Sequence, residues 1–144
     1  MTLRDAATGI PRAREELFAA HLLGTSGFAA QTVALAFRAA LAAAEAALLG
    51  LDRPSPPEPA AVVAAFVRHV VTERGLDAGA GRLLRSLHNR AELAHADGAV
   101  PQEQGPAAIV DATAIVDVVE AWLQHAEYVG IARGTRTNPP RRRP

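Results

Sequence analysis

Apolar residues recur at three- and four-residue spacing in five stretches of the chain, and segments rich in glycine or proline separate these stretches. This spacing is typical of amphipathic helices, and no stretch shows the apolar–polar alternation and turn signals of paired strands. The pattern therefore predicts an all-α protein, an up-and-down four-helix bundle with an additional short N-terminal helix. The expected helices cover residues 11–23, 28–49, 60–73, 78–96 and 106–129.

Alanine dominates the second of these helices, with bulky apolar residues at intervals. Alanine is the strongest helix former, and its small side chain lets a neighbouring helix approach closely. We therefore expect residues 28–49 to form the central, mostly buried helix. Gly24, Gly50 and Gly75 are expected to end the first three helices, and Asp77 is expected to cap the start of the fourth.

The last helix carries two apolar strips. One strip is enough to join a bundle, so the second indicates either a further contact, such as a dimer interface, or burial on both sides within the bundle. The first strip comprises Ile109, Val116, Val119, Leu123 and Ala126, and the second comprises Val110, Val118, Trp122 and Val129.

Charge is unevenly distributed along the 144 residues. All fifteen basic residues are arginine, and five of them lie in residues 133–144 without any acid, so residues 1–132 hold ten arginines against fifteen acidic residues. This negative balance does not favour a broad surface for duplex nucleic acid. We predict a helical domain over residues 1–132 and a disordered Arg/Pro-rich tail over residues 133–144.

Compartment and membrane association are inferred from what the sequence lacks. The chain has no cysteine, which excludes a disulfide framework and thiolate metal sites. Its first residues, MTLRDAATGIPRAREE, hold no apolar signal core. The alanine-rich run 39–49 is about half as long as the ~20 residues that span a bilayer. We therefore expect a cytoplasmic protein with no membrane partner.

Arg90 interrupts the apolar stripe of the fourth helix. At about 100° per residue it shares an arc with Leu83, Leu87 and Ala94. A charge resists burial unless a partner neutralises it, so one interpretation is a buried salt bridge, with Glu45 or Asp117 as the partner. The alternative is that Arg90 faces a cleft and binds an anion, because its planar guanidinium suits phosphate.

Two histidines and a glutamate lie on the same helix. His88 and His95 share a stripe, and Glu92 lies between them within helical reach of both. His95 lies roughly 140° from Arg90 around an ideal helix, so one chain is not expected to bring these two side chains together, whereas a two-fold dimer could. An imidazole that passes protons and an arginine that holds phosphate suffice for metal-free RNA cleavage by the 2′-hydroxyl. The histidine spacing does not fit a zinc site, and we expect neither a metal nor another cofactor.

Residues 12–129 contain an ordered series of segments, ELFAAHLLGTSGFAAQ, ALAFRAALAAAEAALL, AAFVRHVVTERG and LLRSLHNRAELAH, before the long apolar last helix. In this order the segments resemble the first three helices and the arginine-bearing segment of the HEPN superfamily, particularly its small bacterial stand-alone members. Many HEPN proteins are RNases of toxin–antitoxin, abortive-infection or CRISPR systems. Their signature is an arginine, four to six residues, then a histidine, and Arg90 and His95 match it with four residues between them.

The resemblance implies a homodimer that cuts RNA without metal in a cleft holding both motifs. Arg90 would polarise the scissile phosphate, and His95 would act as general acid or base. The family often has a polar residue directly after the arginine, whereas here Ala91 follows Arg90 and Asn89 precedes it. Asn89, together with His88 and Glu92, is therefore a candidate substrate contact.

The resemblance also implies a second hypothesis, because HEPN domains pair with minimal nucleotidyltransferases. In that case the second apolar strip of the last helix docks a nucleotidyltransferase or an antitoxin, and Arg90 is a structural ion-pair residue. The sequence leaves both hypotheses open: a homodimeric endoribonuclease acting as a toxin or defence component, and a non-catalytic interaction module.

Overall fold

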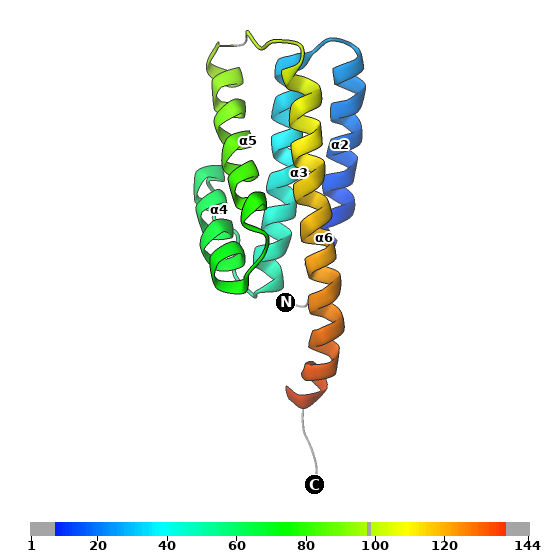
Figure 1. Cartoon of the computed structure of the whole chain (residues 1–144), viewed down its shortest axis with the longest axis vertical. Helices are drawn as coiled ribbons and strands as arrows, with labels where there is room; N and C mark the ends of the chain where they lie inside the picture. Colours follow the sequence, from blue (N-terminus) through cyan, green and yellow to red (C-terminus); the bar gives the residue numbers. More distant parts are fainter. Residues whose placement is uncertain (1–7, 98, 138–144) are drawn as a thin grey trace.

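The computed structural model describes residues 8–97 and 99–137, with the side chains of residues 8–96 and 99–125. Every regular element in these ranges is helical, which confirms the all-α prediction (Figure 1). The elements are α2 (Gly9–Thr25), α3 (Ala29–Gly50), α4 (Pro59–Ala65), η1 (Phe66–Thr72), α5 (Ala78–Asp97) and α6 (Gln104–Thr137).

The alanine-rich helix α3 occupies the centre, as the sequence predicts. It contacts α2, α4, η1, α5 and α6, and Figure 1 shows it between α2 and α5 with α6 in front. Small side chains let these neighbours approach its backbone closely, and larger side chains on the neighbours fill the space between the helices. The buried alanines of α3 include Ala36, Ala39, Ala40, Ala43, Ala44, Ala46 and Ala47.

The other helices are arranged around α3 in a fixed order. α6 contacts both α2 and α5, whereas α2 makes no contact with α5 among the described residues. The first helix is longer than expected: α2 has 17 residues, whereas α4 has only seven before η1 continues it. Among the described residues the shortest helical segment is therefore not the N-terminal helix but the α4–η1 rod (α4 continued by η1), which lies against α3 and α5.

The rod changes from an α-helix to a π-helix at Phe66, which the sequence analysis did not predict. Val62, Phe66 and Val70 are all fully buried although they are spaced four residues apart. In an α-helix such a step overshoots a full turn, because a turn holds 3.6 residues. The wider π turn makes the second step fall short of a full turn, so all three side chains face α3 and α5.

Most helix ends follow the predicted signals. α3 ends at Gly50, Gly75 adopts a left-handed φ of 75° after η1, and Asp77 accepts a hydrogen bond from the Gly79 amide at 3.3 Å. The prediction for Gly24 was wrong, because α2 continues to Thr25. Gly27, with a φ of 83°, makes the turn into α3 instead, since glycine takes this conformation without steric cost.

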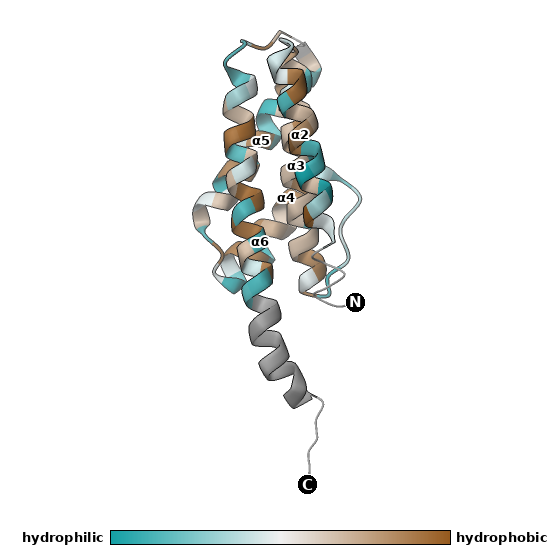
Figure 2. Ribbon diagram, turned by 90° about the vertical axis from the view of Figure 1, so that its right-hand side faces the viewer, coloured by the Kyte–Doolittle hydropathy of each residue, from teal (hydrophilic) through white to brown (hydrophobic). Residues whose placement is uncertain are grey.

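The two strips of α6 have different surroundings. In the first strip Ile109, Val116, Val119 and Leu123 are buried, whereas the side chain of Ala126 lies outside the described residues. In the second strip Val118 and Trp122 pack against the core and Val110 is exposed; Val129 also lies outside the described side chains. Figure 2 shows hydrophobic segments along α5 and α6.

α6 extends to Thr137, beyond residue 133, where the sequence analysis placed the start of the tail. Residues 138–144, like residues 1–7, lie outside the described residues. The sequence analysis did not expect a segment long and apolar enough to cross a membrane, but α3 is such a segment by length and composition alone, since it has 22 residues and contains an 18-residue window with a mean hydropathy of 1.7. More than half of this segment is buried inside the bundle, as the core helix of a bundle requires.

Substitution of a central alanine tests the close approach to α3. Ala40→Leu adds a branched side chain at a fully buried position, so we expect the free energy of unfolding to fall by about 1–3 kcal/mol. Ala34→Leu on the exposed side of the same helix is the control and should change it by less than about 0.5 kcal/mol. Urea denaturation measures both, and equal effects would contradict a tightly packed centre.

A hydrogen bond between a histidine and a carboxylate at the end of η1 gives a pH dependence. The Nδ1 atom of His69 lies 3.0 Å from a carboxylate oxygen of Glu73, and this hydrogen bond is the main cause that lowers the pKa of Glu73 below its ordinary value. A carboxyl with a lowered pKa stabilises the fold above its unfolded pKa, and this contribution disappears as the pH falls through the folded value. We expect His69→Phe to return the pKa of Glu73 towards the ordinary value near 4.3, measured by NMR titration of the carboxyl carbon. His21→Phe, at an exposed histidine of α2, should leave the titration of Glu73 unchanged.

Candidate functional site

α5 carries all the candidate residues predicted from the sequence, and its inner face fixes their orientation. Leu84 and Leu87 are fully buried and Ala94 nearly so, whereas Leu83 packs partly buried against the core. These residues hold one side of α5 against α3 and α6, which confirms that Arg90 belongs to the inward-facing stripe. Its guanidinium therefore has to find a partner at the edge between α5 and α6.

That partner is Asp111 of α6, which the sequence analysis missed. A guanidinium nitrogen (Nη2) of Arg90 lies 2.6 Å from a carboxylate oxygen of Asp111, and its Nε donates to the Ser86 carbonyl at 3.4 Å. The two side chains are 21% and 29% exposed, so the pair is neither sealed inside the bundle nor fully hydrated. No hydrogen bond joins the second terminal nitrogen of Arg90, Nη1, to any described residue, so this donor stays open to a ligand.

The two acids proposed as partners of Arg90 interact elsewhere. Asp117 lies 2.8 Å from Arg14 of α2, which also binds Glu120, and Glu45 accepts a hydrogen bond from the Ser55 hydroxyl at 3.1 Å. The hydrogen bond to Glu120, with a further one to Asp117, raises the pKa of Arg14. The prediction of a salt bridge was correct in kind but wrong in partner.

His95 does not join Arg90 within one chain. Its side chain is exposed in the last turn of α5, and no hydrogen bond or ion pair links it to the described side chains. This agrees with the angular separation expected on the helix. Asn89 is likewise exposed and makes no polar contact with a described residue.

His88 has a packing role that the sequence analysis did not predict. Its ring stacks on Phe37 of α3 with centroids 5.2 Å apart and an interplanar angle of 30°, and it is mostly buried. Glu92 lies 3.8 Å from the outer nitrogen of this ring, Nε2, and is itself well exposed. Glu92 therefore reaches His88 as predicted, but makes no such contact with His95. Within the described residues, no three histidine or acidic side chains gather closely enough to hold a metal ion.

Arg90 also forms one wall of a pocket of about 390 Å³ at the end of the bundle where the α5–α6 connection passes. The apolar lining comes from Val33 of α3, Leu93 and Ala94 of α5, and Val100 and Pro101 of the connection. Gln104, the first residue of α6, adds a carboxamide. The connection was predicted only as a break between helices, so its contribution to a pocket was not anticipated.

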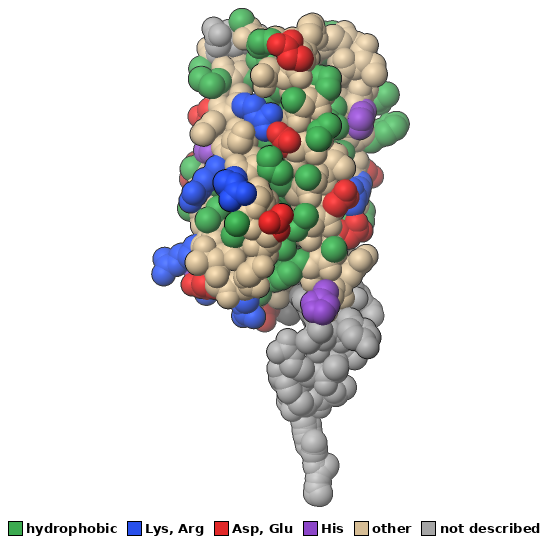
Figure 3. Space-filling model, viewed as in Figure 1, with side chains coloured by type: hydrophobic (Ala, Val, Ile, Leu, Met, Phe, Trp, Pro, Cys, Tyr) green, Lys and Arg blue, Asp and Glu red, His purple; other side chains and the backbone are tan. Residues whose placement is uncertain are grey.

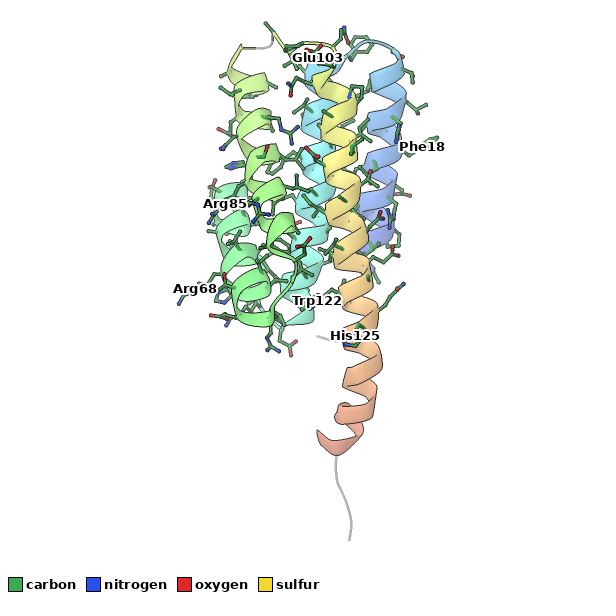
Figure 4. The ribbon with its side chains drawn as sticks, viewed as in Figure 1. Phe18, Arg68, Arg85, Glu103, Trp122 and His125 are labelled. Atoms are coloured by element: carbon green, nitrogen blue, oxygen red, sulfur yellow. The ribbon has the colours of Figure 1, made fainter. Side chains whose placement is uncertain are left out.

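The surface around the Arg90–Asp111 pair has exposed apolar side chains near the pair, and its basic and acidic side chains lie on opposite sides. Leu93, three residues after Arg90, and Val110, directly before Asp111, are 68% and 67% exposed. Figure 3 shows arginine side chains mostly over the α5 side of this face and acidic side chains mostly over α6 and α2. Figure 4 shows Arg85 extending from α5, and Phe18 pointing away from the bundle on the opposite edge.

Comparison of the chain with protein-family models, with curated proteins and with solved structures found no match.

A double-mutant cycle measures the Arg90–Asp111 interaction. We expect Arg90→Met and Asp111→Asn to show a coupling free energy of about 1 kcal/mol, because the pair is well aligned but still partly hydrated. Arg85→Met combined with Asp111→Asn is the control and should show additive effects, since no hydrogen bond or ion pair joins Arg85 to this acid and Arg85 lies exposed on α5. Urea denaturation gives the four free energies, and additivity in both cycles would exclude a stabilising pair.

Proposed function

We propose that this chain is a HEPN-type endoribonuclease, a bacterial toxin or defence component that acts as a homodimer in the cytoplasm. The observation that supports this proposal is the position of Arg90: its guanidinium forms a pocket wall and keeps Nη1 free of described partners. A donor in this position suits a phosphate oxygen. In this proposal α2, α3, α5 and α6 are the four-helix HEPN core and α4–η1 is the additional element.

The reaction requires no group beyond a base, an acid and a charge-stabilising donor. The 2′-hydroxyl of the RNA attacks the adjacent phosphorus, the bond to the 5′-oxygen breaks, and the products end in a 2′,3′-cyclic phosphate and a 5′-hydroxyl. Arg90 stabilises the negative charge that develops on the phosphate oxygens. His95 accepts the 2′-hydroxyl proton or delivers a proton to the leaving 5′-oxygen, since an imidazole can act as either a general base or a general acid.

A second copy of the chain would bring an arginine and a histidine close together, because Arg90 and His95 lie apart within one chain. Leu93 and Val110, on the two helices that carry Arg90 and Asp111, offer apolar contact, since large apolar side chains that are about two-thirds exposed favour burial. A two-fold axis parallel to the helices would place the arginine-rich α5 side of one copy opposite the acidic α6 side of the other. Such a contact would line one groove with Arg90 and His95 of both copies.

Arginine and histidine substitutions test this function. We expect Arg90→Ala and His95→Ala each to reduce cleavage of single-stranded RNA by about 100-fold or more, since each removes one catalytic contribution. Arg53→Ala, in the loop after α3, and His125→Ala, both at exposed positions, are the controls and should retain activity. The assay follows 5′-hydroxyl and cyclic-phosphate ends, and circular dichroism checks that each variant is folded. Equal cleavage by the wild type and both site variants would remove the ribonuclease proposal.

A non-catalytic interaction module is the second candidate, and the Arg90–Asp111 pair is the observation that favours it. An acid at 2.6 Å neutralises most of the field that would attract a phosphate. In that case Leu93 and Val110 contact a nucleotidyltransferase or an antitoxin, and Arg90 holds α5 to α6. Wild-type protein without cleavage activity, together with a Leu93→Asp variant that no longer binds a candidate partner, would support this alternative.

A further inference from the structure

The pocket beside Arg90 combines apolar walls with polar groups that have no partner. Val33 and Ala94 form its buried side, and Leu93, Val100 and Pro101 form its outer walls. The carboxamide of Gln104 makes no hydrogen bond with any residue whose side chain the structure describes, and neither does Nη1 of Arg90. A ligand that satisfies both groups needs apolar faces, a polar edge that pairs with the carboxamide, and an acceptor for Nη1, such as a phosphate oxygen.

We propose that this pocket binds one nucleobase of the RNA and that Gln104 determines which base it accepts. A nucleobase has flat apolar faces and an edge of hydrogen-bond donors and acceptors, and proteins hold unstacked bases between apolar side chains. The pocket volume of about 390 Å³ lies within the range of small-ligand sites. This inference deepens the proposed ribonuclease function and rests on it for the phosphate that the base carries.

The carboxamide of Gln104 points to adenine as the preferred base. It offers one acceptor and one donor side by side, and adenine presents the complementary pair at N6 and N7. Because Arg90 lines the same pocket, a base held by Gln104 has its own phosphate close to the free Nη1 donor. Asp111 then acts as a positioning residue, since its bond to Nη2 fixes the plane of the guanidinium.

Mononucleotide binding tests the pocket without any catalytic step. The full chain is titrated with AMP, CMP and ribose 5-phosphate, and chemical shifts or heats report the dissociation constants. We expect AMP to bind at least about fivefold more tightly than CMP or ribose 5-phosphate, which is the lower range for one bidentate contact. Equal affinity for AMP and ribose 5-phosphate would overturn the proposal, because the base would then contribute nothing.

Variants of Gln104 assign the selectivity to this side chain. Gln104→Ala should remove the preference for AMP, whereas Gln31→Ala, at an exposed glutamine of α3, should keep it. Gln104→Glu should shift the preference towards CMP, since a carboxylate accepts from the cytosine amino group. A loss of structure alone cannot exchange one preference for another. Ala99→Trp, on the exposed rim, fills the pocket without entering the core and should weaken AMP binding.

RNA cleavage separates failure of this inference from failure of the proposed function. If the wild type cleaves RNA and Gln104→Glu cleaves at the same bases, the inference is wrong and the ribonuclease proposal stands. If the wild type does not cleave RNA, the proposed function is wrong, and the AMP titration alone decides whether the pocket binds a base. A changed base preference at the cleavage site in Gln104→Glu supports both.

Discussion

The close approach of helices to α3 is the constraint on which the rest of the structure depends. The small alanine side chains do not hold neighbouring helices apart, so α2, α5, α6 and the α4–η1 rod all pack against α3. The few large side chains of α3 therefore strongly influence how the neighbouring helices are positioned. Phe37 stacks on His88, and Val33 forms the buried side of the pocket next to Arg90. The rotation of α5, and with it the direction of Arg90, therefore follows from the packing of α3.

The sequence predicted local features well because local physics determines them. The helices follow from apolar spacing, Asp77 from cap chemistry, and Gly75 from its tolerance of a left-handed backbone. It also predicted that Arg90 needs a partner, since a charge on an inward stripe must be compensated. The identity of that partner was not predictable, because Asp111 is 21 residues away and the choice among several acids depends on the register between α5 and α6.

Contacts between helices also explain the other differences between the predicted and the observed structure. The π-helix of η1 depends on how Phe66 and Val70 fit against two other helices, which no single-segment pattern contains. His88 was interpreted as a polar candidate because its stacking partner lies on another helix. An acid within an apolar run signals that α6 carries a partner for Arg90, but Asp111 between Val110 and Ala112 and Asp117 between Val116 and Val118 give this signal equally.

The Arg90–Asp111 pair sets the terms on which any anion can bind. An isolated guanidinium attracts phosphate strongly but rotates freely, so ordering it costs conformational entropy at the moment of binding. Asp111 fixes the plane of the guanidinium before a ligand binds, so binding orders the side chain less. Its negative charge also weakens the long-range attraction between Arg90 and an anion. A site built in this way discriminates by contact geometry more than by charge. Such a site fits a single-stranded ligand whose base and phosphate are recognised together, on a protein body whose overall charge does not attract nucleic acid.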